Sequence, residues 1–252
     1  MMTRRLTMKL LLSALAVTGW IAAAPAMAGD AKTVNMALDW TPNTNHVGLY
    51  VAQEKGFFKD AGLTVNILPY TDTGAATLVS NGLADFGIAG VGFYSQRAAG
   101  ADVKAVYAVV QSDTGRLVVE ADRNDIKSPK DLDGKTYGGF GSAWENALVG
   151  SLIKNDGGKG DFKTVTLGTS AYEAMGNKSV DFTLEILTWE GVQAELAGEK
   201  LHAFKYSDYG VPDQYTTTIV SSDKYLKANP DTAKAFLAAV EKGYAFAVDY
   251  KE

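Results

Sequence analysis

The chain alternates short apolar runs of strand length with longer runs of helical periodicity, and this alternation restricts its fold more than any other feature. Short runs rich in β-branched residues predict buried strands, and the runs between them predict helices. Glycine follows several helical runs, as expected where a helix ends in a residue with positive φ. These glycines are Gly56, Gly62, Gly82 and Gly100. Such alternation is typical of βαβ units, so we expect mostly parallel sheets flanked by helices.

A polar stretch at residues 122–130 interrupts this pattern, which restarts at Lys135. Ser128 and Pro129 suit the N-cap and first position of a short helical turn. An interruption followed by a restart predicts two α/β lobes with a cleft between them. The predicted strands are residues 34–38, 63–68, 84–88, 103–110, 115–120, 135–140, 162–167, 180–187, 201–206 and 215–220. The predicted helices are residues 46–55, 74–81, 91–99, 143–155, 172–177, 189–197 and a last helix that begins at Asn229-Pro230.

Residues 1–28 have the organisation of an export signal. Arg4, Arg5 and Lys9 form a positive n-region, residues 10–17 form an apolar h-region, and residues 26–28 (AMA) form a cleavage signature. The apolar run is shorter than the roughly 20 residues that a membrane span needs. We therefore expect cleavage after Ala28 and a mature protein that is exported and not membrane-embedded.

The composition excludes several classes of function. A net charge of −5, with no basic cluster after the signal, argues against nucleic acid or anionic lipid as a partner. The chain has no cysteine, so it cannot form a disulfide, a thiolate metal site or a thioether lipid anchor. The two histidines, His46 and His202, stand in no metal-binding motif, and no G-x-S-x-G motif marks a serine nucleophile. We expect neither a metal, a cofactor nor a catalytic residue.

Residues 39–50 (DWTPNTNHVGLY) are the strongest candidate for a binding site. They join the first predicted strand to a helix, and ligands of open α/β sheets bind at such carboxyl ends of strands. The loop exceeds the usual 2–6 residues and carries side chains that suit a planar polar molecule. The alternative is an ordinary loop with Trp40 in the core and Asn45 as a helix cap. The candidate ligand-binding residues here are Asp39, Trp40, Asn43, Asn45, His46 and Tyr50.

A second candidate loop follows the strand at residues 135–140. Its sequence, Gly139-Phe140-Gly141-Ser142, resembles the opening of a dinucleotide fingerprint, but Trp144 stands in place of the third glycine. Ser142 and Glu145 fit a capping box better, which gives Glu145 a structural role. Phe140 and Gly141 remain site candidates, because glycine lets backbone N–H groups approach a ligand closely.

Aromatic side chains are in surplus near the carboxyl ends of the predicted strands. Tyr94, Trp144 and Trp189 are candidates to join Trp40 in a stacking pocket for a flat heterocycle, with core packing as the alternative for each. Glu190, beside Trp189, is either an acceptor for a ligand amine or an acid that favours a helix start.

Four segments carry a family resemblance. They are D-W-x-P-N-x-x-H from Asp39, EKGFFKDAGL at 54–63, NGLADFGIAG at 81–90 and SPKDLDGKTYG at 128–138. In this order they resemble periplasmic solute-binding proteins of ABC transporters, in the branch for thiamine pyrimidine precursors, with nitrate, sulfonate and taurine binders more distant. The resemblance implies a two-lobed, type II periplasmic-binding-protein-like α/β fold whose lobes are joined by two crossover strands and close on the ligand. It places lobe 1 at 33–118 and 218–252, and lobe 2 at 119–217, with the return segment C-terminally incomplete.

The resemblance further implies a non-enzymatic protein that captures a small heteroaromatic ligand in the periplasm and delivers it to permease subunits. Glu190 matches an acid that pyrimidine binders place opposite the ligand amine. Arg97 and Arg116 are the arginines near the relevant segments, and both are interpreted as solvated, which favours a neutral or cationic ligand over an anion. Binders of sulfonate, nitrate or riboflavin-type ligands share most of these landmarks and remain alternatives.

The other alternative is an enzyme. Fungal hydroxymethylpyrimidine phosphate synthases have a similar fold and carry a histidine at the position of His46, which in those enzymes binds the cofactor and supplies the pyrimidine. They also have a cysteine-rich iron site. The corresponding region here is residues 210–217 (GVPDQYTT), and the absence of cysteine together with the export signal argues against this alternative.

Overall fold

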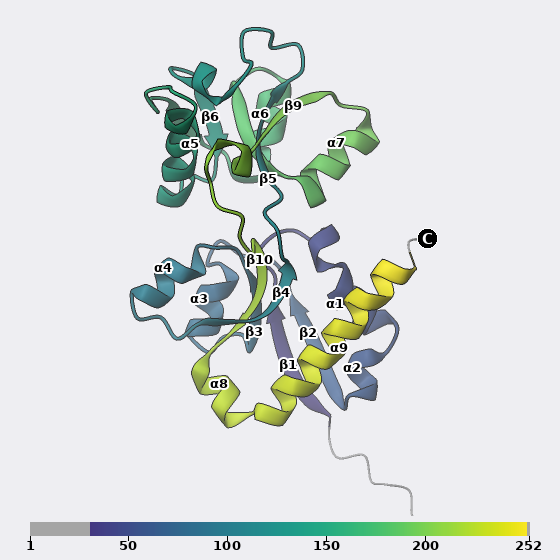
Figure 1. Ribbon diagram of the computed structural model, residues 1–252. Helices are drawn as coiled ribbons and strands as arrows, with labels where there is room; N and C mark the ends of the chain where they lie inside the picture. The colour runs from purple at the N-terminus through teal and green to yellow at the C-terminus, as the bar shows by residue number, and fades with distance from the viewer. Residues whose placement is uncertain (1–30, 251–252) are drawn as a thin grey trace, which may run out of the picture.

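The structure, a computed structural model, describes residues 31–250, and the predicted export signal lies outside the described residues. The chain forms two lobes, one above the other in Figure 1, and each contains one five-stranded sheet flanked by helices. The predicted two-lobed α/β architecture is confirmed. In the described part of the chain, no helix has both the length and the apolar composition that a membrane crossing requires.

Lobe 1 is built on a sheet with strand order β2-β1-β3-β10-β4. Alternate residues of β1 face opposite layers, as the period of a strand requires. Val34 and Met36 pack with α1, α2 and α9, whereas Ala37 packs with α3 and α4. The strands are β1 (Lys32–Ala37), β2 (Leu63–Leu68), β3 (Phe86–Ala89), β4 (Lys104–Val110) and β10 (Thr217–Ser221). The helices are α1 (Val47–Glu54), α2 (Phe57–Asp60), α3 (Ala75–Ser80), α4 (Phe93–Ala98), α8 (Asp223–Ala228) and α9 (Pro230–Asp249).

Lobe 2 is built on a sheet with strand order β7-β6-β8-β5-β9. Its larger apolar layer contains Leu117, Tyr137 and Phe182 together with residues of α5, and a smaller layer on the other face contains Val118 and residues of α6. The strands are β5 (Gly115–Glu120), β6 (Thr136–Gly139), β7 (Lys163–Thr166), β8 (Phe182–Ile186) and β9 (Leu201–Lys205). The helices are α5 (Ala143–Asn155), α6 (Ala171–Gly176) and α7 (Val192–Ala197).

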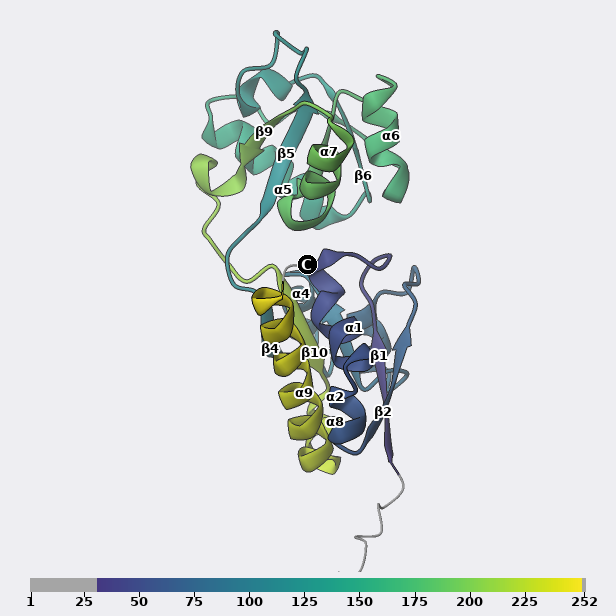
Figure 2. The same ribbon diagram turned by 90° about the vertical axis from the view of Figure 1, so that its right-hand side faces the viewer.

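One strand in each sheet runs against the other four, and these reversed strands follow the two connections between the lobes. In lobe 1 it is β10, antiparallel to both β3 and β4. In lobe 2 it is β5, antiparallel to both β8 and β9. The sheets are therefore mostly parallel, with one antiparallel strand each. Figure 2 shows both connecting segments on the same side of the molecule.

Most predicted strands and helices occur within two residues of their expected bounds, and β2, β5 and α5 match them at both ends. The four predicted helix-ending glycines all have positive φ. The helices α2 and α8 are missing from the predicted helical ranges, although Gly62, which follows α2, was predicted as a helix-ending glycine. Both are short. Helix α2 begins directly after Gly56, where a connecting loop was expected to follow the preceding helix.

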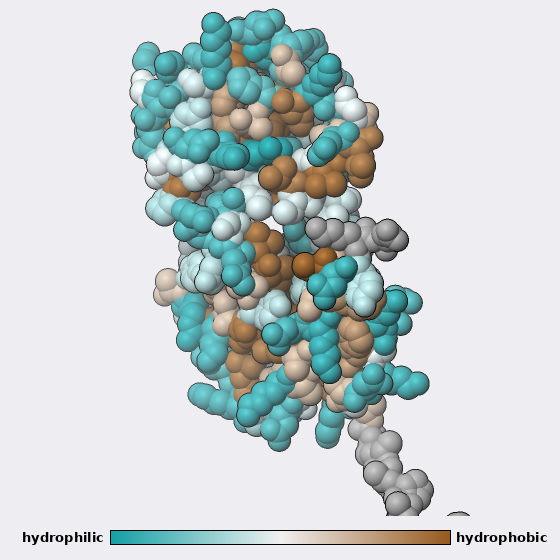
Figure 3. Space-filling model, turned by 45° about the vertical axis from the view of Figure 1, so that its right-hand side comes forward, coloured by the Kyte–Doolittle hydropathy of each residue, from teal (hydrophilic) through white to brown (hydrophobic). Residues whose placement is uncertain are grey.

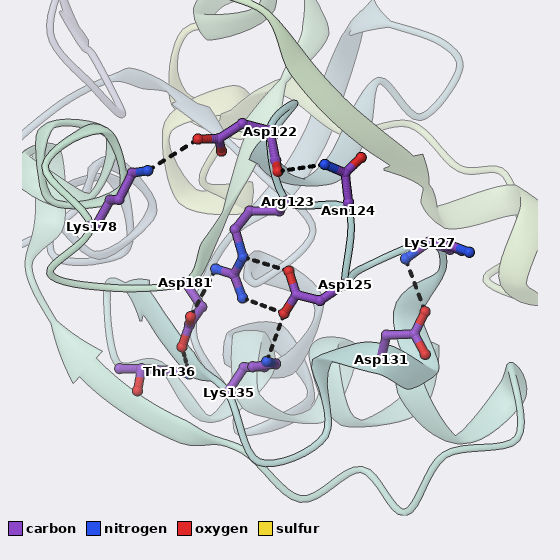
Figure 4. A network of polar contacts seen from close by, with 10 residues as sticks. All are labelled: Asp122, Arg123, Asn124, Asp125, Lys127, Asp131, Lys135, Thr136, Lys178 and Asp181. Carbon is purple, nitrogen blue, oxygen red and sulfur yellow. Dashed lines mark hydrogen bonds and ion pairs between the residues drawn. The ribbon is translucent and has the colours of Figure 1, made fainter.

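An ion-pair network lies in lobe 2, around the segment that joins β5 to β6 (Figure 4). Arg123 donates to both oxygens of Asp125, at 2.8 and 3.0 Å, and to Asp181 at 2.9 Å. Asp181 also accepts the backbone N–H of Thr136 at 2.8 Å, and Lys135 donates to Asp125 at 2.9 Å. The network lowers the pKa of Asp125, chiefly through the hydrogen bond from Arg123. It holds the polar stretch after β5 against the start of β6.

Glycine permits an unusually close contact between α1 and α9. A Cβ atom on Gly243 would overlap the backbone oxygen of Gly48, and a Cβ on Gly48 would overlap the ring of Tyr244. The same contact brings the Tyr244 hydroxyl within 2.6 Å of the backbone oxygen of Asn45, to which it donates. The long C-terminal helix thereby anchors the loop that follows β1.

We expect Gly243→Ala to destabilise the protein by about 1–3 kcal/mol, because the added methyl group forces the two helices apart. Gly150→Ala, in α5, is the matched control, since a Cβ there meets only ordinary contacts at 3.8 Å. The control should gain about 0.5–1 kcal/mol from the loss of backbone freedom in the unfolded chain. Urea denaturation of both variants checks the opposite signs. Equal stability of Gly243→Ala and the parent protein would contradict the proposed close packing.

Candidate functional site

A cavity of about 450 Å³ lies between the lobes and is walled by both lobes and by the connecting segments. Figure 3 shows apolar surface on both lobes beside the hollow that separates them. Lobe 1 contributes the loop after β1, the start of α3 and the loop from β3 into α4. Lobe 2 contributes the loop after β6 and the end of β8. These are loops at the carboxyl ends of parallel strands, where ligands of α/β proteins bind.

The loop after β1 is held by a compact set of internal hydrogen bonds. Asn43 caps the 3₁₀ helix Thr44–His46, and its side-chain oxygen accepts the Asn45 N–H at 2.9 Å. The His46 ring accepts the Asn43 N–H through Nδ1 at 3.3 Å, and its Nε2 lies 2.8 Å from Asp39 Oδ1. This arrangement requires the proton on Nε2, which donates to Asp39. The residue that caps this helix is thus Asn43. The alternative of an ordinary loop had placed Asn45 in that role.

Trp40 connects the two lobes through aromatic contacts. Its ring centroid lies 5.1 Å from that of Tyr70, in lobe 1, with an interplanar angle of 63°. It lies 4.9 Å from that of Phe140, in lobe 2, at 80°. Edge-to-face pairs of this kind are favourable and fix ring orientation. Trp40 is partly exposed and lines the cavity, so it is not a core residue.

The loop that carries Phe140 is ordered by the buried carboxylate of Glu145. This carboxylate accepts hydrogen bonds from the Tyr137 hydroxyl at 3.1 Å, from Phe140 N at 2.9 Å and from Ser142 N at 2.9 Å. The predicted capping box of Ser142 and Glu145 is confirmed. Because Glu145 already binds the Phe140 N–H, this backbone group is not available to a ligand.

Glu190 lies in a π-helical turn, Leu187–Gly191, that follows β8. Its Oε2 accepts the backbone N–H of Ile186 at 3.0 Å, so it does have the structural role that the helix-start alternative proposed. Thr188, in the same turn, contacts lobe 1. Its hydroxyl donates across the cleft to Asn45 Oδ1 at 2.7 Å, and its backbone oxygen accepts the Thr44 hydroxyl. The turn therefore contacts the opposite lobe directly.

The cavity is acidic. Asp39, Asp113 and Glu190 line it, and no lysine, arginine or histidine is among the lining residues in the described part of the chain. Burial raises the pKa of Glu190, and the nearby charges of Glu185 and Asp39 add to this effect against the lowering effect of backbone N–H groups. Burial likewise raises the pKa of Asp113. Such a cavity favours a ligand that donates hydrogen bonds or carries positive charge.

Eight of the twelve predicted site residues line the cavity, and four do not. His46 is fully buried behind Asp39, and Tyr50 packs against the apolar core of lobe 1. Tyr94 is 53% exposed and does not line the cavity, whereas its neighbour Phe93 does. Gly141 packs against Thr166. The residues that line it are Asp39, Trp40, Asn43, Asn45, Phe140, Trp144, Trp189 and Glu190.

Sequence reasoning missed Asp113 and Gln214 in the connecting segments, and Tyr206 at the end of the predicted strand 201–206. None of the three lies in a strand–helix loop. The only available signal for Asp113 and Gln214 was their position between two predicted strands of different lobes. The interpretation of Arg116 as solvated was wrong. Its side chain is 20% exposed and forms an ion pair with the buried Glu185, its partner across the β5–β8 ladder. Arg97 pairs with Asp223 at the surface.

The fold and the inter-lobe cavity define a two-lobed protein of the periplasmic-binding-protein fold. The periplasmic aliphatic sulphonate binding protein SsuA from Escherichia coli has a similar structure, with a TM-score of 0.67 at 16% identity over 86% of this chain and 74% of that chain. The Candida albicans CA3427 gene product, described as having the generic periplasmic binding protein fold, has a TM-score of 0.63 at 16% identity over 86% of this chain and 73% of that chain.

Residues 43–252 match the family described as NMT1/THI5 like, and the chain belongs to this family. It is 28% identical over 225 residues to the formylaminopyrimidine-binding protein of Halalkalibacterium halodurans, covering 86% of this chain and 67% of the relative. It is 28% identical over 233 residues to a 4-amino-5-hydroxymethyl-2-methylpyrimidine phosphate synthase of Saccharomyces cerevisiae, covering 86% of this chain and 66% of the relative. The chain thus spans about two thirds of the length of these relatives.

We expect Glu190→Gln to raise the melting temperature of the ligand-free protein at neutral pH. Burial disfavours the charged carboxylate, and glutamine can still accept the Ile186 N–H. Because the pKa of Glu190 is higher in the folded protein than in the unfolded chain, the penalty is present above the folded pKa and disappears below the unfolded value. The difference in melting temperature should therefore close as the pH falls through the usual range of glutamate.

Thermal melts at several pH values check this expectation, with Glu195→Gln as the control. Glu195 is an exposed glutamate in the neighbouring helix α7, and its substitution should change little. A lower melting temperature for Glu190→Gln at neutral pH would show that the charge of Glu190 stabilises the fold.

Proposed function

We propose that this protein is the extracytoplasmic solute-binding component of an ABC importer and captures an aminopyrimidine of the thiamine-precursor type between its lobes. The observation that carries the proposal is the combination of an aromatic wall, Trp40 with Phe140, and an acidic edge at Glu190 in one inter-lobe cavity. The relative named as a formylaminopyrimidine-binding protein supports the choice of ligand class.

An aminopyrimidine matches both features of the cavity. Its ring has a π face that stacks on an indole, and its edge presents an amine donor beside a ring nitrogen. The Glu190 carboxylate accepts from the amine, and also from the ring nitrogen when that nitrogen is protonated. Trp40 contacts the face of the ring and Glu190 contacts its edge, and together they fix the orientation of the ring. The site is therefore selective for the position of the amine on the ring.

The acidic lining argues against the anionic ligands considered from the sequence. A sulfonate or nitrate would meet three carboxylates, Asp39, Asp113 and Glu190, and no cationic partner among the described lining residues. Bringing like charges together in a partly buried site raises the free energy of binding. The acidic lining therefore favours a neutral or cationic heterocycle over these anions.

Some relatives of this chain are named as pyrimidine phosphate synthases, so the enzyme alternative is an activity of that kind. In the resemblance to those enzymes, the residue at the position of His46 binds a cofactor. Here the His46 side chain is fully buried and contacts Asp39 and the Asn43 backbone. In addition, the chain has no cysteine for an iron site. These residues do not fit the synthase chemistry, and they favour a binding role for the loop.

A solute-binding component of an importer acts outside the cytoplasm, so the proposal requires that the chain be exported. Residues 1–28 would direct the chain to the periplasm, and the mature N-terminus would be Gly29, which N-terminal sequencing of the exported protein would identify. In the periplasm the ligand-loaded form would deliver its cargo to permease subunits in the membrane.

We expect Trp40→Ala to weaken the binding of 4-amino-5-hydroxymethyl-2-methylpyrimidine by two to three decades in Kd, about 3–4 kcal/mol, because both stacking and burial are lost. Glu190→Gln should weaken binding by roughly 1.5–3 kcal/mol, because a charged acceptor becomes neutral. Isothermal titration calorimetry measures both changes.

Tyr94→Ala is the control for these titrations, since Tyr94 is exposed and lies outside the cavity. Its Kd should equal that of the parent protein. If Trp40→Ala and Glu190→Gln retain the parent affinity while the parent binds the pyrimidine, the ligand lies elsewhere on the protein.

A further inference from the structure

The two connecting segments meet at one end of the cavity and place polar groups there. Asp113 lies between β4 and β5, and Gln214 and Thr216 lie just before β10. The segments are joined by hydrogen bonds from Thr216 N to Val110 O at 3.3 Å and from Asp113 N to Asp213 Oδ1 at 2.5 Å. The Gly115 N–H donates to the Asp113 carboxylate at 2.8 Å, so the carboxylate is held in place.

Tyr206 reaches the same end of the cavity from lobe 2. Its side chain is 3% exposed and lines the cavity, because Gly115 leaves room for the ring, which a Cβ at that position would overlap. The Tyr206 hydroxyl and the Thr216 hydroxyl are both buried, and neither has a hydrogen-bond partner among the described residues. Buried polar groups are nearly always paired, because an unpaired group costs free energy. Two buried, unpaired hydroxyls that belong to residues lining one cavity end are therefore candidate partners for a ligand group.

We propose that Asp113, Tyr206, Gln214 and Thr216 form a hinge-side subsite that binds a hydrogen-bond-donating substituent of the ligand, either a hydroxyl or an amine. This inference rests on the proposed function. It identifies the residues that bind the end of the same ligand that lies away from Glu190. A carboxylate only accepts hydrogen bonds, so the lone pairs of Asp113 that the Gly115 N–H leaves free suit a donor. The two hydroxyls can accept or donate as the substituent demands.

The negative charge of the subsite also discriminates against phosphorylated ligands. Asp113 and the adjacent Asp213 would repel a phosphate group, and no lysine, arginine or histidine lines this cavity in the described part of the chain. The subsite therefore selects the free alcohol or amine of a pyrimidine over its phosphate ester. This distinction separates a protein that takes up an unphosphorylated precursor from one that retains a phosphorylated product.

The experiment uses three probes, 4-amino-5-hydroxymethyl-2-methylpyrimidine, the 5-methyl analogue that lacks the hydroxyl, and the phosphate ester of the first. In the parent protein the hydroxymethyl compound should bind roughly tenfold more tightly than either of the others. Tyr206→Phe keeps the shape and removes only an unpaired hydroxyl, so the fold should be retained. Asp113→Asn keeps an acceptor for the Gly115 N–H. Both variants should reduce the hydroxymethyl-to-methyl affinity ratio to about threefold or less.

Tyr209→Phe is the matched control, since Tyr209 lies three residues from Tyr206 and does not line the cavity. Its affinity ratio should equal that of the parent. If both pyrimidines bind but the ratio is the same in the parent, Tyr206→Phe and Asp113→Asn, the subsite is overturned while the proposed function stands. Failure of every probe to bind the parent protein overturns the proposed function and the subsite together.

Discussion

The insertion of β10 between β3 and β4 is the constraint on which the rest of the structure depends. The chain leaves lobe 1 through β4, completes lobe 2 and returns antiparallel to both neighbours, and all five residues of β10 are buried. Because the returning strand pairs directly with β4, the strand through which the chain leaves lobe 1, the two connecting segments are held side by side. The cleft consequently has one side fixed by the chain itself, and the cavity-lining residues of the two lobes can separate only by rotation about the connections.

Much of the fold could be predicted because local signals agree with the tertiary structure. The alternation in β1 separates two packing layers, and the capping box of Ser142 and Glu145 marks the start of α5. The helices α2 and α8 were missing from the predicted helical ranges: α2 has only four residues, about one turn, and α8 directly precedes the much longer helix α9. The reversed direction of β5 and β10 was equally inaccessible, since strand direction depends on pairing and not on the residues within the strand.

The candidate site likewise has a part that could be predicted from the sequence and a part that could not. The strand–helix loops could be predicted because ligands of this architecture bind there, and they hold Trp40 and Glu190. The hinge-side residues could not, because Asp113 and Gln214 come together only when the chain returns to lobe 1. The choice between Phe93 and Tyr94 depends on one position of helical register, and the state of Arg116 depends on its cross-strand partner Glu185. Each of these requires a contact between residues that are distant in sequence.

The central claim is that one ligand is held by both lobes at once, with its ring on Trp40 and its amine at Glu190. The cost of burying Glu190 and of leaving Tyr206 unpaired is consistent with a site arranged for a partner that the chain itself does not supply. A crystal structure with 4-amino-5-hydroxymethyl-2-methylpyrimidine tests this claim most directly. The account predicts the pyrimidine ring between the lobes, stacked on Trp40, with its amine within hydrogen-bond distance of Glu190. A pyrimidine bound outside the cleft, or a cleft without ligand at saturating concentration, would contradict it.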